Sequence, residues 1–325
     1  MKPLGALGAG VGLLCSACAG LQSALAPAGP EAADVLELTR VLAFGSGVIL
    51  LLVLLALLLA LRGPAGWRAR FASRRCVLLL GLVLPVGVLS ALLGYGFLVL
   101  RAGATRVEAA APLRIRVIGR QWWWQVVYRH DDGRETVSAN EIRIPTGRTI
   151  ALTLESADVI HSFWVPAYAG KVDMIPGRSN LLHLRADRPG VVRGQCAEYC
   201  GGAHAWMAFY MVALPPDAFA RWLAQERADT PPSREPDGER LFLASGCGGC
   251  HRIRGTPADG SIGPDLTHVG GRLSIGAGVL PADANAFARW IARHPQIKPG
   301  TGMPPFEIHG EVELAALGRY LAERK

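Results

Sequence analysis

The sequence predicts a multidomain membrane protein with three structural parts: a hairpin of two transmembrane helices, an all-β sandwich and a small all-α domain. Two long apolar runs without a charge, residues 41–61 and 76–100, predict the hairpin. From residue 112 on, short runs of alternating apolar and polar residues are separated by turn residues, which is typical of a sandwich. After residue 235 the apolar spacing is that of amphipathic helices.

The composition also indicates a membrane protein. Half of the 325 residues are hydrophobic, and the formal net charge is +8. The basic excess lies around the apolar runs, because residues 1–111 hold nine Lys and Arg against four Asp and Glu, whereas the later parts are nearly balanced. This distribution reflects membrane topology and argues against a nucleic-acid partner. The cysteine spacing does not suggest a disulfide framework, but two Cys pairs, each followed by a histidine, suggest metal or haem.

Residues 1–26 are expected to be an export segment. Lys2 precedes an apolar stretch, as in secretory signals. The segment Leu14–Cys18 resembles the cleavage motif of lipoproteins, and we expect Cys18 to be lipidated. Two alternatives are cleavage after Ala26, which the following proline disfavours, and an uncleaved signal.

The transmembrane hairpin is expected over residues 35–104. Each apolar run is long enough to cross a bilayer core, which takes roughly 20 residues. The loop between the runs, residues 62–75, contains five arginines and no acidic residue. We therefore expect this loop in the cytoplasm, and the chain after residue 101 on the outer face of a bacterial inner membrane.

The sandwich is expected over residues 112–214, followed by a Pro-rich linker over residues 215–235 and the all-α domain over residues 236–325. Turn residues such as Pro176-Gly177 separate the expected strands. These strands are residues 113–118, 122–129, 141–145, 148–155, 159–165, 180–186, 190–196 and 206–213. A short helix is expected at residues 218–227, and further helices at residues 237–245, 284–293 and 311–323.

Four sulfur and nitrogen donors lie close together near the end of the predicted sandwich: Cys196, Cys200, His204 and Met207. Soft sulfur ligands combined with imidazole suit copper. A single zinc ion would make poor use of a thioether, and a disulfide would leave the other two donors unexplained. His161, in an earlier predicted strand, is the candidate for a further ligand, although by itself it would be an ordinary sheet histidine.

This segment resembles the binuclear copper loop of cytochrome c oxidase subunit II, and the resemblance covers roughly residues 30–215. Two further segments resemble that family: Gly119–Trp124, similar to its aromatic patch, and Lys171–Arg178, similar to the loop that packs on subunit I. The resemblance implies a cupredoxin-like fold. Arg120 and Trp123 stand where the family often has His and Tyr, so this surface departs from the pattern.

The resemblance implies a role for each donor in a two-copper centre. Cys196 and Cys200 would bridge the two ions, and His161 and His204 would be terminal ligands. Met207 and the backbone carbonyl of Glu198 would be weak ligands. The Glu198 carboxylate would bind a magnesium ion shared with subunit I, and Trp122 would be the residue through which electrons reach the copper. No donor position is left for a substrate, so oxygen chemistry is expected elsewhere.

A second constellation, Cys247-Gly-Gly-Cys250-His251, is the attachment motif of c-type haem. By itself the motif could also be a redox dithiol or half of a zinc site. Met303 lies 52 residues after His251, in a loop before the last predicted helix, and is the expected sixth ligand; the alternatives are His268, His294 and His309. Residues 236–325 resemble class I cytochrome c domains, which implies that the carbonyl of Pro264 orients His251.

Together these segments resemble subunit II of the proton-pumping cytochrome c oxidases that carry a fused cytochrome c. The resemblance implies electron transfer from a soluble or membrane-bound cytochrome c through the haem and the copper pair to subunit I, which reduces oxygen to water. Subunits I and III and membrane lipid are the expected partners, and the linker would tether the haem domain near Trp122. Alternatives are the electron-accepting subunit of a nitric oxide reductase, a nitrous oxide reductase type, which would need a propeller domain, and a thioredoxin-like copper chaperone.

Overall fold

The structure, a computed structural model, describes residues 20–107, 113–130, 132–306 and 310–325. It contains two compact units: Ala33–Ala110 form one, and the residues before and after this segment form the other. The first unit contains the two long apolar helices. The second contains a β-sandwich and a small helical domain.

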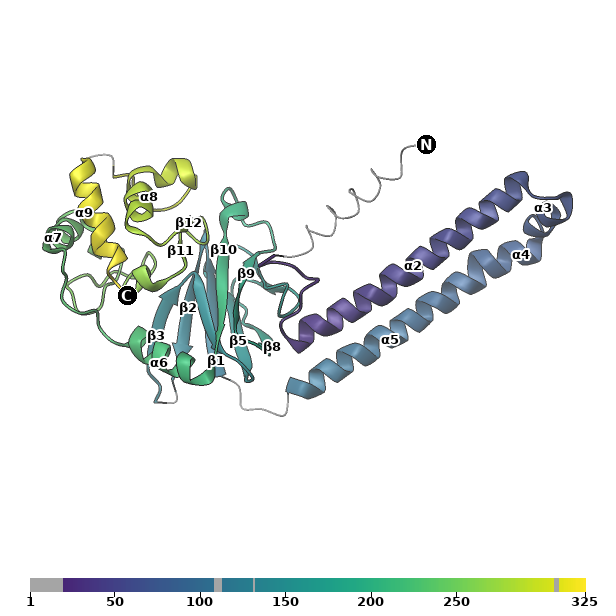
Figure 1. Cartoon of the computed structure of the whole chain (residues 1–325), viewed down its shortest axis with the longest axis horizontal. Helices are drawn as coiled ribbons and strands as arrows, with labels where there is room; N and C mark the ends of the chain where they lie inside the picture. Colours follow the sequence, from purple (N-terminus) through teal and green to yellow (C-terminus); the bar gives the residue numbers. More distant parts are fainter. Residues whose placement is uncertain (1–19, 108–112, 131, 307–309) are drawn as a thin grey trace, which may run out of the picture. The chain divides into compact units, whose positions relative to one another are not determined.

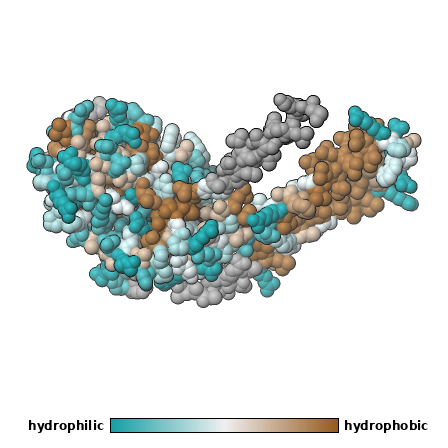
Figure 2. All heavy atoms as spheres, viewed as in Figure 1, coloured by the Kyte–Doolittle hydropathy of each residue, from teal (hydrophilic) through white to brown (hydrophobic). Residues whose placement is uncertain are grey.

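The apolar runs form the helices that the sequence predicts. Helix α2 (Pro30–Arg62) leads to a short helix, α3 (Ala65–Phe71), and the chain returns along α4 (Arg74–Leu78), a π-helical turn η1 (Leu79–Val83) and α5 (Leu84–Val107) (Figure 1). Residues Pro30–Arg62 and Arg74–Arg101 are long and apolar enough to cross a membrane. Their apolar side chains are exposed along both helices, and hydrophilic residues gather at the turn (Figure 2). This arrangement suits a lipid environment.

The wide turn η1 ends at Val83, two residues before Pro85. A proline removes one helical hydrogen bond, and its ring would clash with the carbonyl four residues earlier. A π-helical turn adds room in the helix backbone at this point. The second long helix therefore continues through Pro85 without a break.

The sandwich consists of two five-stranded sheets with strand orders β3-β2-β1-β5-β8 and β4-β10-β9-β6-β7. Most strand pairs are antiparallel, but β1 pairs with β5 and β4 with β10 in parallel. The strands of the first sheet are β1 (Leu113–Arg120), β2 (Trp123–Arg129), β3 (Glu135–Ala139), β5 (Thr149–Ser156) and β8 (Asn180–Arg185). Those of the second are β4 (Glu141–Pro145), β6 (His161–Trp164), β7 (Val172–Met174), β9 (Gly190–Cys196) and β10 (Ala208–Leu214).

Two of these strands are absent from the sequence prediction. Strand β3 buries Thr136 and Ser138, so it lacks the apolar alternation on which the prediction rests. Strand β7 has three residues and pairs with β6 at the edge of its sheet. Both strands are defined by their neighbours in the sheet, because their own sequences carry little strand signal.

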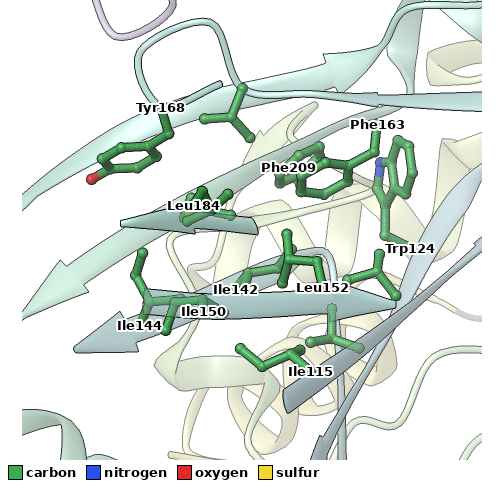
Figure 3. Packing of buried hydrophobic residues seen from close by; sticks show 14 of the residues in the cluster. Ile115, Trp124, Ile142, Ile144, Ile150, Leu152, Phe163, Tyr168, Leu184 and Phe209 are labelled. Carbon is green, nitrogen blue, oxygen red and sulfur yellow. The ribbon is translucent and has the colours of Figure 1, made fainter. Parts of the chain in front are cut away.

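The apolar faces of the two sheets form one core (Figure 3). At the end of the core nearest the cysteine loop, three aromatic rings pack together. Phe163 stacks on Phe209 with ring centroids 4.7 Å apart, and Trp124 meets Phe209 edge-on at 5.1 Å. The rings come from β2, β6 and β10, so their packing fixes β6, which begins with His161, and β10, which follows Met207 directly.

The chain after the sandwich begins with a packed helix, α6 (Pro216–Arg227). Its Phe219 side chain is buried in the sandwich core, and Trp222 packs edge-on against Tyr128 with ring centroids 5.3 Å apart. More than half of the segment expected as a linker is thus an ordered helix that covers the sandwich.

The remaining chain folds into a small helical domain around a second core. Helices α7 and α9 approach closely, because Gly238 has no side chain where a Cβ would lie 2.5 Å from the Ala316 carbonyl oxygen. The elements of the domain are α7 (Pro236–Ala244), η3 (Cys247–Gly249), η4 (Val269–Gly271), β11 (Ser274–Ile275), β12 (Leu280–Pro281), α8 (Ala284–Ile297) and α9 (Glu311–Ala322).

The segment before α2 lies on the sandwich. The amide of Arg193 donates to the Leu21 carbonyl at 2.7 Å, and the amide of Ala28 donates to the Ala167 carbonyl at 2.7 Å. Cys18, the predicted lipidation site, lies outside the described residues.

Candidate functional site

The predicted copper ligands come together at one end of the sandwich. His161 is the first residue of β6, and Cys196 is the last residue of β9. Strand β6 pairs with β9, so that Phe163 lies opposite Cys196. The loop from β9 to β10 carries Cys200, His204 and Met207 back to the same place. The sheet pairing therefore joins a histidine and a cysteine loop that are 35 residues apart in the chain.

The donor atoms lie within reach of shared metal ions. The Sγ atoms of Cys196 and Cys200 are 3.7 Å apart, and Cys196 Sγ lies 3.8 Å from His161 Nδ1. Cys200 Sγ lies 3.5 Å from His204 Nδ1 and 3.8 Å from Met207 Sδ. The donors of His161, Cys196 and Cys200 all lie within 4.8 Å of one another. The two cysteines therefore lie at the centre of the cluster, with His161 beside Cys196 and His204 beside Cys200.

The chemistry of this donor set fits copper. Both cysteines are free thiols, so no disulfide occupies the site. The hydrogen bond from Cys200 lowers the pKa of Cys196 to about 3, and the same contact raises the pKa of Cys200. This contact therefore favours the thiolate form of Cys196, and thiolate is the form that binds soft metals.

Three further residues support the cluster: Asp158, which the sequence analysis did not single out, and Gly119 and Gln121, which belong to the segment similar to the aromatic patch. The His161 Nε2 lies 2.7 Å from the Asp158 carboxylate, which holds the ring so that Nδ1 faces Cys196. Gly119 makes room for this ring, since a Cβ there would lie 2.8 Å from His161 Cδ2. The Gln121 side-chain amide donates to the Cys200 carbonyl at 2.8 Å. A carboxylate three residues before a candidate metal-binding histidine is a signal that could have identified Asp158.

Trp122 contacts the same carbonyl. Its indole Nε1 donates to the Cys200 oxygen at 2.9 Å. The tryptophan named by the family resemblance is therefore one hydrogen bond away from a candidate copper ligand.

Glu198 has its backbone and its carboxylate in different surroundings. Its carbonyl oxygen lies 3.1 Å from Cys196 Sγ, on the side of the cluster. Its carboxylate is half-exposed and lies 3.8 Å from Lys171 Nζ, which also pairs with Asp173 at 3.0 Å. The backbone is thus placed to act as a weak metal ligand, while the carboxylate faces outward.

The second site surrounds the Cys-x-x-Cys-His motif. His251 Nδ1 lies 2.8 Å from the Pro264 carbonyl, as the cytochrome c resemblance implies. This bond leaves Nε2 as the nitrogen available to a metal. Burial lowers the pKa of His251 and keeps the imidazole neutral, which is the ligating form. Gly263 forms a cradle for the ring, because a Cβ there would lie 2.5 Å from His251 Cε1.

A cavity of about 380 Å³ opens beside this histidine. Both cysteines of the motif and Met303 line it, and most of its other walls are apolar. Among these apolar residues are Phe242, Leu266, Phe287, Ile291, Leu317 and Leu321. An apolar cavity that is lined by two thiols and an imidazole fits a covalently attached haem.

The histidines weighed against Met303 have other partners or lie outside the described residues. His268 Nε2 lies 3.0 Å from the Ala228 carbonyl. His294 Nε2 lies 2.9 Å from the Met303 carbonyl, where it holds the backbone of the candidate ligand. His309 belongs to the segment that the structure does not describe.

Comparisons with known proteins match both parts of this unit. Residues 132–214 match the family model of the periplasmic domain of cytochrome c oxidase subunit II, and residues 236–325 match that of cytochrome c. The all-β sandwich also differs from the thioredoxin-like fold of the copper chaperone considered as an alternative.

The similar curated proteins carry the name of the same family. Cytochrome c oxidase subunit 2 of Alkalihalophilus pseudofirmus is 36% identical over 214 residues, which are 65% of this chain and 61% of the relative. The corresponding protein of Bacillus sp. PS3 is 33% identical over 225 residues, or 65% of this chain and 62% of the relative. The chain thus spans less than two thirds of the length of these relatives.

One similar solved structure is the periplasmic domain of subunit II of cytochrome oxidase from Bradyrhizobium japonicum. It is 33% identical, with a TM-score of 0.34, and the match covers 36% of this chain and 94% of that domain.

Proposed function

We propose that the chain is subunit II of a proton-pumping haem-copper oxidase, because residues 132–214 match the periplasmic domain of cytochrome c oxidase subunit II and residues 236–325 match cytochrome c. In this role it takes electrons from an external cytochrome c on its haem, passes them to a two-copper centre and delivers them to subunit I, where oxygen is reduced to water. The observation that carries the proposal is the close grouping of two cysteines, two histidines and a methionine at one end of the sandwich.

Two copper ions would use all of these donors. Cys196 and Cys200 would bridge the ions, with His161 and His204 as terminal ligands, and with Met207 and the Glu198 carbonyl as weak ones. Such a pair shares a single transferred electron across both ions. The protein holds the imidazoles and thiolates in place through Asp158 and the packed strands, so that little of the surrounding structure must change on electron transfer.

The haem would be bound through thioether links to Cys247 and Cys250. His251 and Met303 would be the axial ligands, a pair that raises the reduction potential relative to two histidines. The bond from His251 to Pro264 and the bond from His294 to Met303 support both ligands from behind. Trp122, which bonds to the Cys200 carbonyl, would then connect the haem domain with the copper ligands.

The remaining assignments follow the membrane topology. The hairpin would place both metal-binding domains on the periplasmic face of the inner membrane, because the arginine-rich turn favours the cytoplasm. The Glu198 carboxylate, which faces outward from the sandwich, would bind magnesium at the boundary with subunit I, and subunit III would complete the complex. Lipidation at Cys18 would retain the segment from residue 20 on, which bonds to the sandwich through Leu21 and Ala28.

The metal content of the full chain tests this proposal. The chain is produced in a host that attaches haem c, purified in detergent and supplied with copper. We expect two copper ions and one haem iron per chain, with an electron paramagnetic resonance signal from one unpaired electron shared by two copper nuclei. A single copper ion, or zinc in its place, would contradict the assignment.

A further inference from the structure

Lys298 has an unusual position between the sandwich and the haem domain. It follows helix α8 of the haem domain, and only 2% of its surface is exposed. Its Nζ donates to three carbonyl oxygens: those of Trp122 at 2.7 Å, Trp206 at 2.8 Å and Gly276 at 2.8 Å. The first two belong to the sandwich and the third to the haem domain, so this one side chain bonds to both.

The bonds match the chemistry of an ammonium group, which has three N–H donors and no acceptor. A buried lysine loses the solvation of its charge, and burial lowers the pKa of Lys298 to about 7. Three short bonds to carbonyl oxygens replace that solvation. All three bonds form together only in the arrangement in which the carbonyls from both parts of the chain surround the ammonium group.

Trp122, whose carbonyl accepts a bond from Lys298, lies between the two candidate metal-binding loops. A Cβ on Gly300 would lie 3.1 Å from the Trp122 ring, so only a glycine, here with φ of 83°, lets the haem-domain backbone approach the indole this closely. Gly300 lies three residues before Met303. The other side of the indole bonds to the Cys200 carbonyl. Trp122 thus lies between the loop of a candidate haem ligand and the loop of a candidate copper ligand.

Further bonds hold the same interface. The amide of Ala208, directly after Met207, donates to the Ala277 carbonyl of the haem domain at 3.0 Å. At a second position, the Leu273 amide donates to the Glu141 carboxylate at 2.7 Å, and Arg143 donates to the Gly271 carbonyl at 2.8 Å. Hydrogen bonds therefore join the haem domain to the sandwich at two separate positions.

The connecting segment is fixed as well. The amide of Thr230 donates to the Arg254 carbonyl at 3.2 Å, and the Arg254 side chain donates back to the Glu226 and Ala228 carbonyls. Since helix α6 packs on the sandwich, the segment cannot act as a loose tether while these bonds exist.

We propose that Lys298 is an interdomain latch, which holds the haem domain on the sandwich with Trp122 covered by Gly300. The role of this latch in electron transfer rests on the proposed function. While it is closed, haem-to-copper transfer needs no docking step. The haem domain also covers the tryptophan, so that external cytochrome c reduces the haem and not the copper pair directly.

The test compares Lys298→Met with Arg289→Met in the full chain loaded with copper and haem. Methionine keeps much of the length of the lysine side chain but makes none of its three bonds. Arg289 is an exposed cation on helix α8, so its replacement removes the same charge from the same domain without touching the interface. Hydrogen exchange is measured at the Ala208 and Leu273 amides, which donate across the interface, and in β5 as a check that the sandwich remains folded.

We expect both interface amides to exchange about tenfold faster or more in Lys298→Met, because hydrogen bonds donated by a charged group are stronger than those between neutral groups. Arg289→Met and the β5 amides should match the wild type. Haem-to-copper transfer should slow and become sensitive to solvent viscosity only in Lys298→Met. If the Ala208 and Leu273 amides exchanged at the wild-type rate in Lys298→Met, the latch would be overturned. Absence of haem-to-copper transfer in the wild type would instead overturn the proposed function, while the exchange result would still decide whether Lys298 closes the interface.

Discussion

Replacing Cys196 by serine is expected to remove both copper ions while the haem iron is retained. Cys196 Sγ contacts the other thiol, one imidazole and the Glu198 carbonyl, so its loss leaves neither ion with a full set of donors. A serine hydroxyl is a harder and much weaker ligand for copper than a thiolate. Copper per chain should fall from two to near none, with loss of the near-infrared copper absorption.

Cys76→Ser is the matched control for this variant. Cys76 lies in helix α4, in the membrane hairpin, and is not part of the cluster. Its replacement should leave two copper ions and one iron per chain. If Cys196→Ser kept two copper ions, the cysteine could not be a bridging ligand.

Replacing Met303 by leucine is expected to lower the haem reduction potential strongly without releasing the haem. Cys247 and Cys250 would still hold the group, and leucine fills a similar volume in the apolar cavity. Only the thioether donor is lost. Because axial ligands set haem potentials over a span of about 0.8 V, we expect a fall on the order of 0.1 V or more, measured by redox titration.

Met174→Leu is the control for the thioether. Met174 is fully buried in the sandwich core and makes no contact with the haem cavity. Its replacement should leave the haem potential unchanged. An unchanged potential in Met303→Leu would show that another residue is the sixth ligand, and His294, which already contacts the Met303 carbonyl, would then be the first to examine.

Local patterns predicted much of this molecule. The two apolar helices follow from the length of their uncharged runs, whereas most of the strands and the helices of the haem domain follow from residue periodicity. The fold class and both domains of the resemblance agree with the family matches. Strand β3 was missed because its buried residues are polar, and β7 because three residues carry no period.

The interface between the sandwich and the haem domain could not be predicted in this way. A lysine in a Pro-Gly segment after a helix is typical of a solvent-exposed turn, yet Lys298 is buried by contacts with residues 176 and 92 positions away. The linker composition similarly indicated a tether, whereas α6 and Arg254 fix the segment through tertiary contacts. The spacing within a motif identifies the donor residues, but only the folded chain shows contacts such as the one at Gly119, which makes room for the His161 ring.

Time-resolved electron transfer within the full chain tests the central claim most directly. The haem of the loaded chain is reduced by a light flash, and haem and copper absorption are followed at several protein and salt concentrations. We predict that haem oxidation and copper reduction proceed together, at one rate that is independent of protein concentration and nearly independent of salt, because donor and acceptor belong to the same chain. A rate of copper reduction that rises in proportion to protein concentration would contradict the account, and so would the absence of copper reduction.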